Sequence, residues 1–141
     1  MLGTTAYAGD VLRSSDRRVE YMQFIWQFTS PVEAARVYGD TRALANRCPK
    51  TSLTSGGVAE RVTIQDQARA PVDGHGSFEA DETATLAGAP SAVLFKTLWC
   101  ADRADLLLVG VVTSTQGASA LQLLLLRTLM HDLIGRVQAA R

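Results

Sequence analysis

The sequence predicts an α+β fold, a two-layer domain in which a twisted antiparallel sheet of about four strands packs against two helices. Three observations carry this prediction. Residues 18–29 alternate apolar and polar side chains with the period of a strand, and residues 92–113 form two more apolar runs joined by a short turn. Two amphipathic segments, residues 31–47 and 118–139, have the spacing of helices. The 141 residues contain no internal repeat and no linker, so we expect a single domain over residues 1–141.

The first predicted strand, residues 18–29, is rich in aromatic side chains. Four large residues recur at every second position and share one face: Met22, Phe24, Trp26 and Phe28. A period of two with aromatic residues indicates a strand with one strongly buried face. The second face carries Tyr21 and Ile25 and is also apolar.

The first predicted helix has a clear start signal. Ser30 is a natural N-cap, Pro31 stands at the first helical position, and Glu33 completes a capping box. Pro49 prevents continuation, so the helix should end at about Arg47. Its expected inner stripe consists of Ala34, Val37, Tyr38, Thr41, Leu44, Ala45 and Cys48.

The segments around these two elements carry weaker signals. Residues 1–17 are expected to be irregular, and residues 51–57 to form a polar loop. Residues 58–68 fit a strand near a sheet edge, followed by a loop over residues 71–76. Residues 78–86 suit a strand only in part, because their acidic side chains disfavour one: Glu79, Asp81 and Glu82.

The C-terminal half predicts a hairpin and a long helix. Residues 92–99 and 104–113 are strands joined by a short link, and the apolar run over residues 106–112 is typical of a central strand buried on both faces. The helix over residues 118–139 is expected to bury Leu121, Leu125, Leu129, Leu133 and Val137, with Leu124 and Ile134 widening the stripe.

Composition excludes several classes of protein. Lys plus Arg equals Asp plus Glu, at 14 each, which argues against a nucleic-acid binder. No apolar stretch approaches the about 20 residues of a membrane span. The N-terminal residues lack a basic region followed by an apolar one, so we expect no signal peptide in this sequence.

One set of large apolar residues is the candidate ligand site: Met22, Phe24, Trp26, Phe28, Phe95 and Trp99. These side chains either form plain core under the helices or line an apolar cleft. Two helices leave part of a sheet uncovered when strands are apolar on both faces, and an uncovered apolar face is typical of a cleft or a partner surface.

Histidine offers the alternative, an enzyme. His75, with Asp73 or Glu79 nearby in the sequence, could act as a general base. No phosphate loop, nucleophile elbow, zinc motif or calcium loop occurs. The sequence therefore assigns no catalytic residue, no metal site and no cofactor. The two cysteines, Cys48 and Cys100, are either free buried thiols or one disulfide.

The chain resembles the extracellular sensor domain of actinobacterial PknH-type Ser/Thr kinases and the related lipoproteins. The resemblance starts at Tyr7 and covers most of the chain from there to the C-terminal helix. Its motifs are Phe28-Thr29-Ser30-Pro31, Glu33-Ala34-Ala35, Cys48-Pro49, Cys100, Arg103, the apolar strand 106–112 and the helix 121–137. The family typically has four cysteines and an extra N-terminal helical segment, which this sequence lacks.

The resemblance implies a twisted antiparallel sheet with a large cleft for an extracellular ligand, and no established catalytic residues. It also implies a location outside the cytoplasm and a disulfide at Cys48 and Cys100. We therefore expect a non-catalytic, sensor-like domain that binds a small or apolar, lipid-like ligand in a cleft of the sheet. The alternatives are the small enzyme based on His75 and a homo-oligomer, such as a homodimer, in which a sheet face is an interface.

Overall fold

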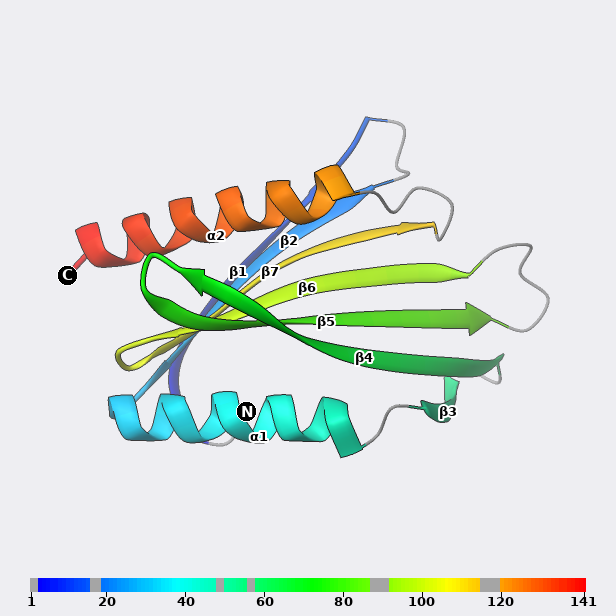
Figure 1. Ribbon diagram of the computed structural model, residues 1–141, viewed down its shortest axis with the longest axis horizontal. Helices are drawn as coiled ribbons and strands as arrows, with labels where there is room; N and C mark the ends of the chain where they lie inside the picture. The colour runs from blue at the N-terminus through cyan, green and yellow to red at the C-terminus, as the bar shows by residue number, and fades with distance from the viewer. Residues whose placement is uncertain (1–2, 16–18, 48–49, 56–57, 87–91, 115–119) are drawn as a thin grey trace.

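The computed structural model describes residues 3–15, 19–47, 50–55, 58–86, 92–114 and 120–141. They form an α+β fold of two helices and one antiparallel sheet (Figure 1). The strands are β1 (Thr4–Arg13), β2 (Glu20–Phe28), β3 (Lys50–Ser55), β4 (Val58–Val72), β5 (His75–Leu86), β6 (Val93–Asp102) and β7 (Asp105–Ser114). The helices are α1 (Pro31–Arg47) and α2 (Ala120–Ala139).

The sheet has seven strands in the order β1-β2-β7-β6-β5-β4-β3, so the expectation of about four strands is wrong. Two of the extra strands, β1 and β3, come from the segments expected to be irregular or loop. The apolar alternation of both segments is weak, and each lies at an edge of the sheet, where backbone pairing to one neighbour holds it. The acidic segment 78–86 belongs to β5, a fully paired inner strand.

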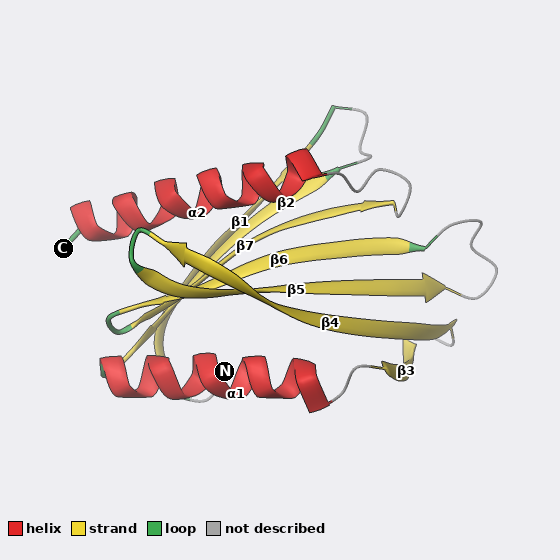
Figure 2. Cartoon of the chain, viewed as in Figure 1, coloured by secondary structure: helices red, strands yellow, loops and turns green. Residues whose placement is uncertain are grey.

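The two helices cover opposite faces of the sheet, which corrects the two-layer prediction (Figure 2). Leu107 and Val109 of β7 share a core with α2, whereas Leu106 of the same strand shares a second core with Ala34 of α1. Because successive side chains of a strand point to opposite faces, β7 needs apolar cover on both sides. The predicted burial of β7 on both faces is confirmed, and a layer of helix on each side results from it.

The start of α1 agrees with the sequence signal in part. The Ser30 hydroxyl accepts a hydrogen bond from the Glu33 N–H (3.2 Å), as an N-cap does. The Glu33 carboxylate accepts a hydrogen bond from the Thr29 hydroxyl (2.6 Å). Leu44, expected on the inner stripe, is exposed. Cys48 lies outside the described residues.

The expected stripe of α2 is confirmed in part, because Leu133 and Ile134 are buried and Leu129 and Val137 pack against the same core. Leu126, Met130, Leu133 and Ile134 are buried against the sheet, whereas Leu124 and Leu125 are exposed. Seven of the first ten positions of this helix are apolar, so the helical period alone did not decide which row faces inward.

The hairpin of β4 and β5 reaches the helix layer of α2 at its tip. Its two-residue turn, Asp73-Gly74, has both residues at positive φ (50° and 79°), the conformation that Asp-Gly turns favour. Val72 lies in the core beneath α2, and Arg127 of α2 donates a hydrogen bond to the Pro71 carbonyl (3.0 Å). The expected loop over residues 71–76 is therefore reduced to this turn.

We expect Met130→Ala to lower the free energy of unfolding by about 2–5 kcal/mol, because it removes a fully buried side chain from the core under α2. Leu124→Ala, on the exposed side of the same helix, should change it by less than about 0.5 kcal/mol. Urea unfolding of both variants measures the difference. Equal effects would contradict the assignment of the buried row.

Candidate functional site

Four strands contribute to one continuous aromatic surface, which lies on the α1 side of the sheet. We call it the aromatic face, and it consists of Tyr7, Met22, Phe24, Trp26, Phe78, Phe95 and Trp99. Trp26 and Trp99 stack with ring centroids 5.7 Å apart and planes 11° apart. Trp99 also stacks on Phe78, at 5.9 Å and 3°, and Tyr7 stacks on Phe24, at 5.8 Å and 18°. The row therefore runs unbroken from β1 to β5.

Two glycines let the large side chains of β2 lie flat on the neighbouring strands. Gly9 of β1 stands opposite Phe24, and a Cβ at Gly9 would collide with the Phe24 ring. Gly110 of β7 stands opposite Met22, and a Cβ there would lie 2.9 Å from Met22 Cγ. The missing side chains on β1 and β7 provide the space that the β2 side chains occupy.

Helix α1 covers only one end of this surface. Phe28 is buried in the core with Ala34 and Leu106, where Trp26 and Trp99 pack against it. Phe78 is buried as well and meets the Tyr38 ring of α1 edge-on, with centroids 5.1 Å apart. The other side chains of the sequence-predicted site, Met22, Phe24, Trp26, Phe95 and Trp99, are half-buried. The structure thus brings all six predicted residues to one sheet face and buries Phe28 completely.

Tyr7 belongs to this surface but was missed by the sequence analysis. Its side chain is 59% exposed and makes ring contacts with both Phe24 and Trp26. The segment Tyr7-Ala8-Gly9-Asp10-Val11 does carry a period of two. That signal was weak because glycine occupies the middle position of the face.

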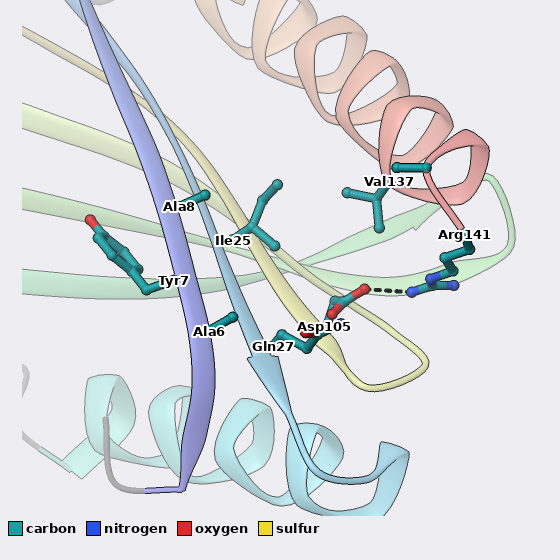
Figure 3. Close-up of a pocket in the computed structure, with 9 residues that line it drawn as sticks. Ala6, Tyr7, Ala8, Ile25, Gln27, Asp105, Val137 and Arg141 are labelled. Atoms are coloured by element: carbon teal, nitrogen blue, oxygen red, sulfur yellow. Dashed lines mark hydrogen bonds and ion pairs between the residues drawn. The ribbon is translucent and has the colours of Figure 1, made fainter.

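A separate groove lies on the opposite side of the sheet, between β1, β2 and the C-terminal half of α2. Two adjoining cavities of about 250 and 280 Å³ make it up. Figure 3 shows Ile25 and Val137 facing each other across it, with Ala6 and Ala8 on its β1 side and Tyr7 turned away. The small side chains of β1 leave this space open, and its lining is mainly apolar.

The C-terminal end of α2 is fixed beside this groove by charge. Arg141 donates hydrogen bonds to the Asp105 carboxylate (2.5 Å) and to the Asp102 carbonyl (3.3 Å). Both aspartates are buried at the turn between β6 and β7. The positive charge of the guanidinium therefore offsets the free-energy cost of burying these two carboxylates.

The histidines do not assemble the predicted catalytic pair. Asp73 interacts with His131 of α2, at 2.6 Å from its Nδ1, while His75 Nδ1 lies 3.7 Å from Asp102 Oδ1. The His131 side chain is exposed, and His75 is half-buried at the start of β5. Each histidine thus stands next to a different carboxylate, where the β4–β5 hairpin meets α2 and the end of β6.

The other proposed partner of His75, Glu79, is fully buried and bonded to Lys96. Lys96 also donates to both carboxylate oxygens of Asp81, at 2.8 and 2.9 Å. Burial raises the pKa of the Asp81 carboxyl, and the negative charge of Glu79 adds to the shift against the opposing effect of Lys96. Burial works to lower the pKa of Lys96, but hydrogen bonds to Asp81 and Glu79 outweigh it and raise that pKa. Lys96 is therefore a cation at neutral pH and not an amine nucleophile.

Cys100 is fully buried in β6. Burial, together with the negative charges of Asp102 and Asp73, raises the pKa of its thiol to about 12. A thiol of that kind is a weak nucleophile. Since Cys48 lies outside the described residues, the disulfide between Cys48 and Cys100 stays a prediction.

Among the described residues, no group of three or more His, Cys, Asp or Glu side chains is arranged to hold a metal ion. Within the same part of the chain, neither helix combines the length and the hydropathy needed to cross a bilayer.

Comparison with known proteins gives no family. No protein-family model matches the chain, and no curated protein matches it. A crystal structure of the protein PA94 from Pseudomonas aeruginosa, of unknown function, is similar at a TM-score of 0.46 and 12% identity. The similarity covers 79% of this chain and 70% of that one, and it carries no inference about function.

We expect Lys96→Met to lower the free energy of unfolding by about 3–5 kcal/mol, because it leaves the buried Glu79 carboxylate without its cation. Arg36→Met is the matched control, since Arg36 pairs with Asp40 (2.9 Å) on the exposed side of α1. Its effect should stay below about 1 kcal/mol. Chemical unfolding at neutral pH measures both, and a similar small effect for the two variants would contradict a buried ionic cluster.

We expect Cys100 to resist thiol reagents in the native protein, because it is buried and its thiol pKa is raised to about 12. A Cys48→Ser variant isolates it, and Ellman's reagent should react with this variant only after unfolding. The same assay on the unfolded, unreduced natural sequence tests the disulfide. Two free thiols per chain would rule the disulfide out.

Proposed function

We propose that this domain is a non-catalytic binding module that holds a small apolar ligand on the aromatic face. The observation that supports it best is the unbroken row of rings in contact from Tyr7 to Phe78, of which Phe78 packs against α1 while Tyr7 is exposed. Half-buried aromatic rings in contact with one another offer a ligand large apolar area at little cost in side-chain entropy.

The chemistry of the aromatic face favours a ligand with a flat or flexible apolar part. Trp99 Nε1 donates a hydrogen bond to Thr97 Oγ1 (3.1 Å), so these two polar groups beside the rings are paired with each other. Met22 adds a flexible thioether side chain that adapts to irregular apolar shapes. An aromatic or lipid-like small molecule fits this surface better than a charged one.

The enzyme alternative has less support. Asp73 is engaged by His131 and Glu79 by Lys96, so neither carboxylate is committed to His75. The carboxylate beside His75 is that of Asp102, at 3.7 Å, which Arg141 also contacts. A location outside the cytoplasm rests on the resemblance to kinase sensor domains and stays part of the proposal.

Tryptophan fluorescence tests the proposal, because Trp26 and Trp99 are the only tryptophans and both belong to the aromatic face. We expect saturable quenching or energy transfer on titration with 8-anilinonaphthalene-1-sulfonate, and competition by a fatty acid such as decanoate. Phe95→Glu introduces a charge on this face and should weaken binding by at least about tenfold, or about 1.4 kcal/mol.

Ala8→Glu is the control, since it places the same charge in the groove on the opposite side of the sheet. Its binding curve should match that of the natural sequence. Loss of binding in Ala8→Glu with full binding in Phe95→Glu would move the ligand to the groove and contradict the proposal. Circular dichroism of both variants confirms that they are folded.

A further inference from the structure

The edge strand β1 has an open side. It pairs with β2 along one side, and no other strand of the described chain pairs with its outer side. The strand has ten residues and is exposed at every position after Thr4. The mean strand is about 5–6 residues long, so β1 presents an unusually long free edge.

The hydrogen-bond pattern identifies the backbone groups at this edge. The Phe28 N–H donates to the Ala104 carbonyl just before β7, so even-numbered residues of β2 bond toward β7 and odd-numbered ones toward β1. Odd-numbered residues of β2 stand opposite even-numbered residues of β1. Odd-numbered residues of β1 from Tyr7 to Arg13 therefore turn their N–H and C=O groups outward. The Val11 N–H agrees, since it bonds to the Asp10 carboxylate (2.9 Å).

The side chains of β1 do little to protect this edge. Natural edge strands are usually blocked by lysine, proline, a bulge or a covering segment. Between Ala6 and Arg13 the pairing with β2 is regular, and the strand has neither proline nor lysine. Arg13 is engaged by Glu20 (2.7 Å). Large apolar side chains are exposed instead: Tyr7 by 59%, Val11 by 43% and Leu12 by 62%.

We propose that β1 is the interface of a homodimer, in which it pairs antiparallel with β1 of a second copy about a two-fold axis at Gly9. This inference goes beyond ligand binding and does not depend on it. A two-fold axis perpendicular to the sheet pairs each residue of one strand with a residue of the other so that the two residue numbers have a constant sum. This sum must be even, because only then do odd-numbered residues, whose N–H and C=O groups point outward, stand opposite each other. A two-fold axis that passes beside Ala8, Gly9 or Asp10 satisfies this condition and leaves most of the two strands paired.

The centre at Gly9 is the best of the three. Outside the bulge it pairs Tyr7, Gly9 and Val11 with three residues of the partner subunit and allows about six interchain backbone hydrogen bonds. It sets Tyr7 opposite Val11 of the partner subunit, an aromatic and β-branched pair of the kind that stabilises sheets. A centre at Asp10 would set two like charges opposite each other, which is destabilising.

The groove on the α2 side fits the same register. Ala6 of one subunit stands opposite Leu12 of the partner subunit, and Ala6 lines the groove with Val137 and Ala140. The exposed Leu12 of each copy would thus lie at the mouth of a space that small side chains leave open on the other. The same two-fold axis leaves both aromatic faces on one side of a continuous sheet.

Sedimentation velocity tests this proposal on the whole chain at micromolar concentrations. The natural sequence should sediment as a single species with twice the 15.2 kDa mass of the chain. Val11→Lys, which adds a charge at the centre of the interface, should sediment as a monomer with an unchanged circular dichroism spectrum. Val32→Lys, at an exposed position of α1, should remain a dimer. A monomeric natural sequence, or a dimer that survives Val11→Lys, would overturn the proposal.

Disulfide cross-linking tests the register independently, in a Cys48→Ser background. Ala8 and Asp10 of the partner subunit form a non-hydrogen-bonded pair at about 4.5 Å between Cα atoms, close enough for a disulfide. Ala8→Cys combined with Asp10→Cys should give a covalent dimer on oxidation, and Ala8→Cys alone should not. Cross-linking by Ala8→Cys alone would overturn the Gly9 centre.

Discussion

The burial of β7 on both of its faces is the constraint on which the rest of the structure depends. Its side chains alternate between two cores, with Leu107, Val109 and Val111 on one side and Leu106 on the other. A strand of this kind is stable only when apolar groups cover it above and below. The chain meets this need with α2 on one face and α1 on the other, and with strands on both flanks of β7 (Figure 1).

The cover on the two faces is unequal, and this inequality creates the candidate site. Helix α2 places a row of buried side chains against the sheet, whereas α1 begins shortly after β2 and shields the end of the aromatic face near Phe28. Beyond that end, Phe24 and Met22 lie flat over Gly9 and Gly110 and shield the backbone themselves. The result is a half-buried aromatic surface, which suits the apolar ligand proposed for it.

Charged groups in the interior are held by specific partners and so contribute to architecture. The acidic residues of β5 are compatible with an inner strand because Lys96, from the neighbouring strand, bonds to both Glu79 and Asp81. Arg141 does the same for the aspartates at the turn between β6 and β7. In a low-dielectric interior such pairing is required for a charge to be tolerated at all.

The sequence by itself determined the α+β class, the strand at β2, the start of α1 at Ser30 and the two-sided burial of β7. These features depend on local periodicity, capping and composition, which act within one element. It also grouped the large residues of β2 on one face, because a period of two fixes the face of every strand residue relative to its neighbours.

Tertiary structure decided the rest. The edge strands β1 and β3 exist through backbone pairing and carry little apolar signal of their own. The inward row of α2 depended on where the sheet lies, since much of the helix is apolar all round. The partners of Asp73 and Glu79 were likewise decided at long range, because His131 and Lys96, distant in sequence, bond to those carboxylates.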